Sequence, residues 1–219
     1  DGDISITVTG NANAEASFYA PVVSLSGAEL AVNFVEARLL GSQDAYIENA
    51  NVRADDISVI SRFNDSDTGI GANAIIAGGG QGNGTSFSAS VYSINSNTAI
   101  ADAASNVVAR VVNANLTAAK KVSVKTEGKA VSKSDYSGRE ISAGLAAFGV
   151  FVSKAYTNGS FQAYIDNGNQ NITAGSLEVL TDYTAVADAK TTTPGKGVSV
   201  TLASGTVNLA EAKVNEEQD

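Results

Sequence analysis

Apolar residues occupy every second position in several short stretches of this chain. Four of these stretches resemble one another, and they lie at 3–8, 56–60, 121–125 and 176–180. Such alternation places the apolar side chains on one face of a pleated strand and the polar side chains on the other. The same pattern continues at 198–202 and 207–210, so we expect a chain built mainly of β-strands.

The run from 143 to 152 is almost wholly apolar, which fits either a strand covered on both faces or a short helix. It contains Gly144 and Gly149, and a glycine costs about 1 kcal/mol in a helix interior. The cluster Val150-Phe151-Val152 consists of residue types that are enriched in strands. The run therefore favours a strand.

The four similar stretches recur at nearly constant spacing. Their first apolar residues lie 53, 65 and 55 residues apart, and they are Ile4, Ile57, Val122 and Leu177. A second phrase, Ala-Tyr-Ile-acid-Asn, occurs at 45–49 and 163–167, while Thr-Ala-Ile-Ala-Asp at 98–102 replaces it before the third copy. A fixed period indicates a repeat array. We expect one segment, 1–219, with approximate units 1–53, 54–118, 119–173 and 174–219.

These features predict an all-β fold, a parallel β-helix or β-solenoid. A unit of about 55 residues exceeds the roughly 20–29 residues of a short solenoid repeat, so each unit would make two or three coils. The whole chain would then form about eight to ten coils, a rod on the order of 40–50 Å long at about 4.8 Å per strand. An antiparallel β-sandwich is the alternative, because short strands at regular spacing also fit that fold.

The composition excludes several kinds of chemistry. The chain has no His, Cys, Met or Trp, so it lacks a thiol nucleophile, a catalytic triad, a histidine base and a zinc site built on His or Cys. We expect no enzyme activity, no catalytic residues, no metal and no cofactor.

The two ends of the sequence suggest a piece of a larger protein. It begins at Asp1 without an initiator Met or an apolar signal segment, and a strand-like stretch runs almost to its end without a capping element. We therefore expect a segment cut from a longer array. Cysteine avoidance combined with many Asn, Ser, Thr and Gly residues is typical of exported surface filaments, which predicts an extracellular location.

The charge distribution gives one candidate binding surface. The net charge of −9 opposes nucleic-acid binding. Within this acidic chain a basic stretch could face anionic glycans or lipid headgroups, and its members are Lys120, Lys121, Lys125, Lys129, Lys133 and Arg139. The alternative is a solvated outer strand face, because Val122 and Val124 alternate with polar neighbours.

Three other motifs favour structural interpretations. The glycine-rich stretch 78–85 lacks the Lys of a phosphate loop and the Asp of a calcium-binding repeat, so a loop is expected. The stretch 65–69 has two Asp residues but no further calcium ligands, which favours an Asx turn. Asp55 and Asp56 are adjacent on a strand and point to opposite faces, so they cannot act together as acid and base. Aromatic side chains could stack on sugars or fill the core, and they include Phe18, Tyr19, Tyr92, Phe148, Phe151, Tyr156, Phe161 and Tyr164.

The repeat phrases resemble those of very large exported filamentous adhesins, the filamentous haemagglutinin class. The Ala-Tyr-Ile-acid-Asn phrase, the Ala/Gly turn and the alternating Ile/Val-Ser-Val strand carry the resemblance, together with Ala-rich stretches such as 207–214. Within this class the chain is most similar to the fusobacterial leukotoxin type. The resemblance covers nearly the whole chain and implies right-handed parallel β-helices secreted by the two-partner route.

The resemblance also implies a function, namely adhesion to host cells and, in the leukotoxin branch, injury to leukocytes. We accordingly expect a non-catalytic binding or structural segment whose partner is a host cell surface, a leukocyte or epithelial receptor, glycan or lipid. The alternative function is a carbohydrate-active β-helix enzyme, a lyase or hydrolase, with two carboxylates about 5–9.5 Å apart. Open strand edges at both ends of a solenoid segment would also favour end-to-end self-association.

Overall fold

The computed structural model describes residues 2–18, 23–64, 71–77, 84–192 and 199–218. Within these ranges the chain forms strands and turns and no helix, which confirms the all-β prediction. The run 143–152 is part of a strand. The strands are β1 (Ile4–Gly10), β2 (Ala14–Phe18), β3 (Val23–Glu48), β4 (Asn51–Phe63), β5 (Ala72–Ala77), β6 (Gly84–Val112), β7 (Asn115–Asp166), β8 (Ile172–Thr173), β9 (Ser176–Thr192) and β10 (Ser199–Gln218).

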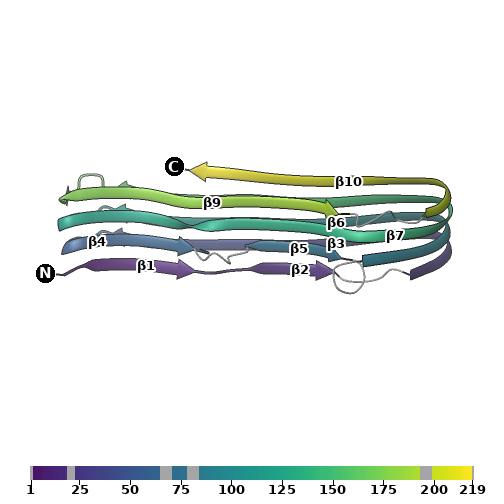
Figure 1. Ribbon diagram of the computed structural model, residues 1–219. Coiled ribbons are helices and arrows are strands. Elements are labelled where there is room, and N and C mark those ends of the chain that lie inside the picture. The colour runs from purple at the N-terminus through teal and green to yellow at the C-terminus, as the bar shows by residue number, and fades with distance from the viewer. Residues whose placement is uncertain (1, 19–22, 65–70, 78–83, 193–198, 219) are drawn as a thin grey trace.

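The chain follows the same path four times, and each passage lies beside the previous one (Figure 1). We call each passage a coil. Coil 1 contains β1, β2 and β3, coil 2 contains β4, β5 and β6, coil 3 is β7 alone, and coil 4 contains β8, β9 and β10. Every strand pair among the described residues is parallel, so the antiparallel sandwich is excluded.

The repeat copies lie in register on adjacent strands. Ile57 pairs with Ile4 on one side and with Val122 on the other, and Val122 pairs with Leu177. One repeat therefore makes one coil. The expectation of two or three coils per repeat, and of about eight to ten coils in all, is wrong, because each strand of a coil is far longer than in a short-repeat solenoid.

The long strands also change the expected shape. The 26-residue β3 spans roughly 85 Å at about 3.3 Å per residue. The described coils number four, and at about 4.8 Å per step they stack to only about 15 Å between the outermost strands. The described residues therefore form a plate that is wide along its strands and thin along its stack, rather than a rod of 40–50 Å.

The Ala-Tyr-Ile-acid-Asn phrase has a different counterpart in coil 2 from the one expected. Tyr46 pairs with Arg110, and Arg110 pairs with Tyr164. The equivalent of this phrase in coil 2 is therefore Ala-Arg-Val-Val-Asn at 109–113, and the assignment of 98–102 to that place is wrong. Arg110 stands where the other two copies of the phrase have a tyrosine, so the phrase is hidden in the sequence of coil 2.

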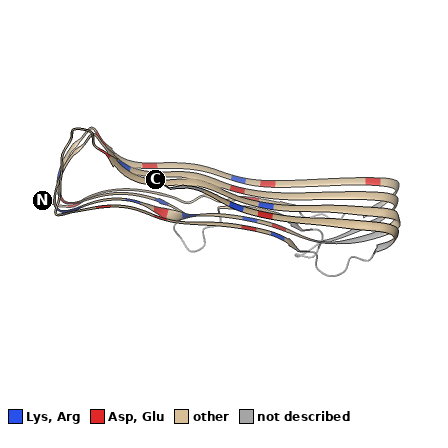
Figure 2. Cartoon of the chain, turned by 90° about the horizontal axis from the view of Figure 1, so that it is seen from above, with Lys and Arg blue, Asp and Glu red and all other residues tan. Residues whose placement is uncertain are grey.

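Each coil contributes to two facing layers. Sheet A contains β1, β2, β4, β5, β8, β9 and the first part of β7, and sheet B contains β3, β6, β10 and the rest of β7. The change of layer in β7 falls between Ser137, which pairs in sheet A, and Gly138, which pairs in sheet B. Seen from above, the layers lie close together towards this bend and diverge towards the other end (Figure 2).

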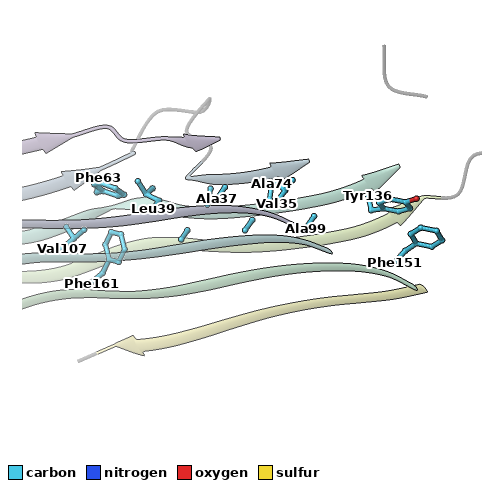
Figure 3. Packing of buried hydrophobic residues seen from close by; sticks show 13 residues of the cluster. Val35, Ala37, Leu39, Phe63, Ala74, Ala99, Val107, Tyr136, Phe151 and Phe161 are labelled. Carbon is cyan, nitrogen blue, oxygen red and sulfur yellow. The ribbon is translucent and has the colours of Figure 1, made fainter. Parts of the chain in front are cut away.

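The width of the space between the layers matches the size of the side chains in it. At the wide end, large aliphatic residues such as Ile57, Leu116 and Val122 are buried. In the narrow part the buried positions are mostly alanines, with stacked aromatic pairs on either side of them (Figure 3). These pairs are Phe161 with Tyr183, at 4.0 Å between ring centroids, and Tyr136 with Phe151, at 4.5 Å.

Buried hydroxyl groups connect the two layers in the narrow part. Ser132 of sheet A and Thr157 of sheet B lie 2.8 Å apart, oxygen to oxygen. Ser153 donates to the hydroxyl and the carbonyl oxygen of Ser134, both at 2.8 Å, and Ser134 donates to the carbonyl oxygen of Ala99 at 2.9 Å. These bonds satisfy polar groups that would otherwise be costly to bury.

Asparagines form the turns that lead from one coil to the next. Asn49 and Asn113 have φ angles of 51° and 47°, and Gly168 has 50° at the corresponding turn after coil 3. Asn and Gly tolerate this left-handed region better than other residues. The amide of Asn115 donates to Oδ1 of Asn51 at 2.8 Å and accepts a hydrogen bond from the backbone nitrogen of Asn171 at 3.0 Å, so the turns are bonded along the stack.

Candidate functional site

The basic stretch lies mainly on the outer face of sheet A. In β7 the even-numbered residues from Val122 to Tyr136 point into the core, so odd-numbered residues point outward. Lys121, Lys125, Lys129 and Lys133 share this outward phase and are four residues apart, about 13 Å at the strand rise. The sequence thus places four cations in a row along one strand.

Lys120 and Arg139 differ from these four lysines. The register between β4 and β7 shifts between Ala54 and Asp56, so β7 carries an extra residue beside Lys120. Lys120 nevertheless remains on this side, because its ammonium group lies 3.8 Å from a carboxylate oxygen of Asp56. Arg139 belongs to the bend of β7, where its backbone pairs with Thr85, and its side chain lies outside the described residues.

Acidic residues of the neighbouring coils surround the row of lysines. Glu178 of coil 4 forms ion pairs with Lys121 and with Lys125, the latter at 3.0 Å. Hydrogen bonds from these two ammonium groups lower the pKa of Glu178 to about 2. Lys133 lies in register with Asp188. The row is therefore a ladder of mixed charges rather than a uniformly positive surface.

This mixed charge changes what the surface can bind. A polyanion needs cations that are not already paired, whereas Glu178 takes up two of the four aligned lysines. Exposed ion pairs are weak, at about 0–1 kcal/mol, so an anionic ligand could still displace Glu178. The basic stretch remains a prediction. Lys133 is its least neutralised described member, because no acidic side chain in the part of the chain that the structure describes forms an ion pair with it.

The structure describes only part of the acidic motifs considered from the sequence. Asp56 faces Lys120, and its backbone nitrogen donates to Oδ1 of Asp3 in the previous coil at 3.2 Å. The stretch 65–69 lies outside the described residues, as does most of 78–85. One other carboxyl group has an unusual environment, since burial raises the pKa of Asp135, with Lys190 opposing and Asp188 adding to this shift. Among the described residues no three acidic side chains gather closely enough to hold a metal ion.

The aromatic residues divide between core and surface. Phe151 and Phe161 are buried and stacked, and Phe18 packs against the same core. Tyr92 and Phe148, by contrast, are about half exposed on the outer face of sheet B. Tyr156 donates to Glu211 at 3.2 Å, Tyr164 is partly exposed, and Tyr19 lies outside the described residues.

An exposed apolar strip on the outer face of sheet B was not expected from the sequence. It crosses all four coils close to the bend, and its members are Leu30, Val32, Phe34, Tyr92, Ile94, Phe148, Val150, Val207 and Leu209. Phe34 is 59% exposed and Leu30 is 73% exposed. The signal was present in 30–35, where nearly every residue is apolar and neither strand face is polar. Contiguous exposed apolar surface is typical of interaction sites.

Comparison with known proteins gives no relative for this chain. It matches no protein-family model, no curated protein and no solved structure among those compared. Within the described residues there is also no helix that could cross a membrane. The functional conclusion therefore depends on the geometry of the coils and their surfaces.

Proposed function

We propose that this chain is a non-catalytic binding and structural segment of a secreted bacterial filamentous adhesin of the leukotoxin type. In this proposal the coils form a right-handed parallel β-solenoid that continues in the parent protein and contacts host cells outside the bacterium. The observation that carries the proposal is the register of Ile4, Ile57, Val122 and Leu177, because one repeat per coil makes a unit to which further coils can be added.

The surfaces of the coils support a binding role. Each added coil would extend the charged ladder of sheet A and the apolar strip of sheet B, so both faces would repeat along the stack. A partner with many copies of a receptor could then engage several coils at once, and linked weak contacts give avidity without a deep pocket. Neither surface requires a cofactor or a reactive side chain.

Binding of the fluorescently labelled protein to leukocytes and epithelial cells tests this proposal. Saturable binding that unlabelled protein displaces is expected, compared with an unrelated acidic β-rich protein of similar size. A pair of charge reversals identifies the face that binds, namely Lys133→Glu on sheet A and Arg38→Glu on sheet B. Loss of binding with Lys133→Glu alone would support the basic stretch. Binding no stronger than that of the control protein would contradict the binding role and indicate that the segment serves only as a structural spacer.

A carbohydrate-active enzyme is the second candidate, and it rests on Asp135. A carboxyl group with a raised pKa can act as a general acid, and Asp188 is near enough to influence it. Release of reducing sugar from a polysaccharide panel would support this candidate if Asp135→Asn abolished the release. Such turnover would contradict the non-catalytic proposal.

A further inference from the structure

A hollow of about 860 Å³ lies on the outer face of sheet B, away from the lysine row. All four coils contribute to it, through Leu40 of β3, Asn106 of β6, Asn158 of β7 and Asn215 of β10. Its volume falls within the range of about 300–1,000 Å³ that is usual for small-molecule sites. The hollow crosses the strands, so its long walls are built from equivalent positions in successive coils.

The strand ladder is interrupted beneath this hollow. The register between β6 and β7 includes the pair Ala103 with Thr157 and resumes at Asn106 with Ser160. Between them lies Ser105, which lines the hollow, is 2% exposed, and has a hydroxyl group without a hydrogen-bond partner among the described residues. Ser105 shares the inward phase of Ala103 and Val107, so its hydroxyl group faces the core rather than the hollow. The polar groups that a ligand could meet come instead from the outward-facing residues of the lining.

The amides in the lining are held in fixed orientations. Asn215 donates to Oδ1 of Asn158 at 2.8 Å, and Asn158 donates to Oδ1 of Asp102 at 3.0 Å. Each amide carries two N–H donors and an oxygen that can accept twice. One donor and at least one acceptor position therefore remain on both Asn158 and Asn215 for a ligand. Ser42, Ser160 and Asn106 add further donors and acceptors around them.

The lining contains no charged side chain. An anionic ligand would need Lys or Arg at the site, and a cationic ligand would need carboxylates. Paired donor and acceptor groups instead match neighbouring hydroxyl groups of a sugar ring, each of which donates and accepts. The exposed side chain of Leu40 offers an apolar contact for the C–H face of the ring.

We propose that this hollow binds a neutral oligosaccharide across the coils. The inference deepens the proposed adhesin function and rests on it, because it names the ligand class that one surface would recognise. It differs from the basic stretch, which would select anionic glycans on the opposite layer. A ligand that crosses several coils would also join them, so binding should raise the stability of the folded stack.

The test is binding of the purified protein to an array of neutral, sialylated and sulfated oligosaccharides, followed by titration of the best neutral one. Asn106 is exposed, and its side chain forms no hydrogen bond with the residues that the structure describes. Asn106→Phe should therefore fill the hollow without unfolding the protein. The matched control is Thr98→Phe, eight residues earlier on the same face of β6. Asn106→Phe should weaken binding at least tenfold, and Thr98→Phe less than twofold, with equal unfolding temperatures.

Each result has a distinct meaning. No neutral oligosaccharide bound, or equal binding by wild type and Asn106→Phe, overturns the assignment of the hollow. Selective binding of sulfated or sialylated glycans that Lys133→Glu abolishes also overturns it and favours the lysine row. Cell binding by the Asn106→Phe variant at wild-type strength would leave the adhesin proposal standing while removing the hollow from it.

Discussion

The side-chain amide of Asn64 makes two hydrogen bonds with the backbone of Ala12 in the previous coil. Its oxygen accepts from the Ala12 nitrogen at 2.8 Å, and its nitrogen donates to the Ala12 carbonyl oxygen at 2.9 Å. Asn167 forms the same pair of bonds with Ala114, both at 2.8 Å. The amide thus replaces a strand partner where the chain of the neighbouring coil leaves the ladder.

This relationship predicts a large effect of removing the amide. Asn64 is 2% exposed and has a φ of 49°, so Asn64→Gly keeps the backbone conformation and removes only the hydrogen bonds. We expect a loss of roughly 2 kcal/mol in the free energy of unfolding, at about 1 kcal/mol per bond. Urea denaturation measures it. Asn106→Ala is the control and should change stability by less than about 0.5 kcal/mol, and equal effects would contradict the structural role of the amide.

Close contact between coils predicts that Gly128 cannot be enlarged. A Cβ atom there would lie 2.3 Å from the carbonyl oxygen of Phe63 and 2.9 Å from the ring of Phe161. We expect Gly128→Ala to destabilise the protein by roughly 1–3 kcal/mol through overpacking. Gly27 has no atom within 4 Å of its Cβ position, so Gly27→Ala should be tolerated. Thermal unfolding of both variants checks the difference, and a stable Gly128→Ala protein would be inconsistent with this spacing of the coils.

The ion pairs of Glu178 predict a dependence of stability on acid pH. Hydrogen bonds from Lys121 and Lys125 lower its pKa from 4.5 to about 2. Because the folded state holds the ionised form, this contribution is present above pH 4.5 and is lost as the pH falls towards 2. Glu178→Gln should therefore reduce the slope of stability against pH in this window. The two proteins should differ least at pH 2, and an unchanged slope would show that the ion pairs contribute nothing.

The raised pKa of Asp135 predicts a pH dependence of stability opposite in sign to that of Glu178. Burial raises the pKa of its carboxyl group, so ionisation opposes folding as the pH rises above the unfolded value of 3.8. We expect Asp135→Asn to increase stability at neutral pH and to have little effect at pH 3. Urea denaturation at both pH values measures this. Destabilisation by Asp135→Asn at neutral pH would show that the ionised group forms a favourable interaction instead.

The open edge of coil 4 predicts self-association of the described segment. Val122 and Val124 of coil 3 are buried in the core. Their register partners in coil 4, Leu177 and Val179, also face inward, yet their side chains are 55% and 44% exposed. We expect concentration-dependent association in sedimentation, because an uncovered strand edge and core can pair with another chain. Val179→Lys should reduce it more than Leu180→Lys, whose side chain points outward. A strictly monomeric wild type at high concentration would oppose this prediction.

Several features of the fold follow from the sequence. Strict alternation predicts the strands, and the recurrence of one phrase predicts that Ile4, Ile57, Val122 and Leu177 are equivalent positions, which the register confirms. Alternation is informative here because a strand side chain has only two directions. The lysines at 121, 125, 129 and 133 share one face for the same reason.

The number of coils could not be obtained in this way. Periodicity gives the length of a repeat, but the length of a coil depends on where the chain bends, and several glycines lie inside strands. Gly128 and Gly144, for example, leave room for neighbouring backbone rather than forming turns. The turns between coils instead occur at Asn49, Asn113 and Gly168, once in each repeat.

The candidate surfaces were also only partly predictable. The partner of the lysine row, Glu178, is more than fifty residues away from Lys121 and becomes a neighbour only through the register. The hollow on sheet B needs equivalent residues from four coils, so Asn106 and Asn158 are unremarkable until the coils are aligned. The alternation along one strand shows on which face of the sheet each residue lies. A site that crosses several coils can be recognised only when the length of a coil is known.

Disulfide formation between chosen positions tests the central claim, one repeat per coil, most directly. Thr98 of coil 2 pairs with Val152 of coil 3, and Phe34 of coil 1 pairs with Thr98, so Phe34 and Val152 are two coils apart. The chain has no cysteine, which makes engineered pairs unambiguous. Adjacent strands bring Cα atoms to about 4.8 Å, within the range for a disulfide, whereas two coils separate them by about 10 Å. Oxidation should cross-link Thr98→Cys with Val152→Cys and leave Phe34→Cys with Val152→Cys reduced, and failure of the first pair would contradict the account.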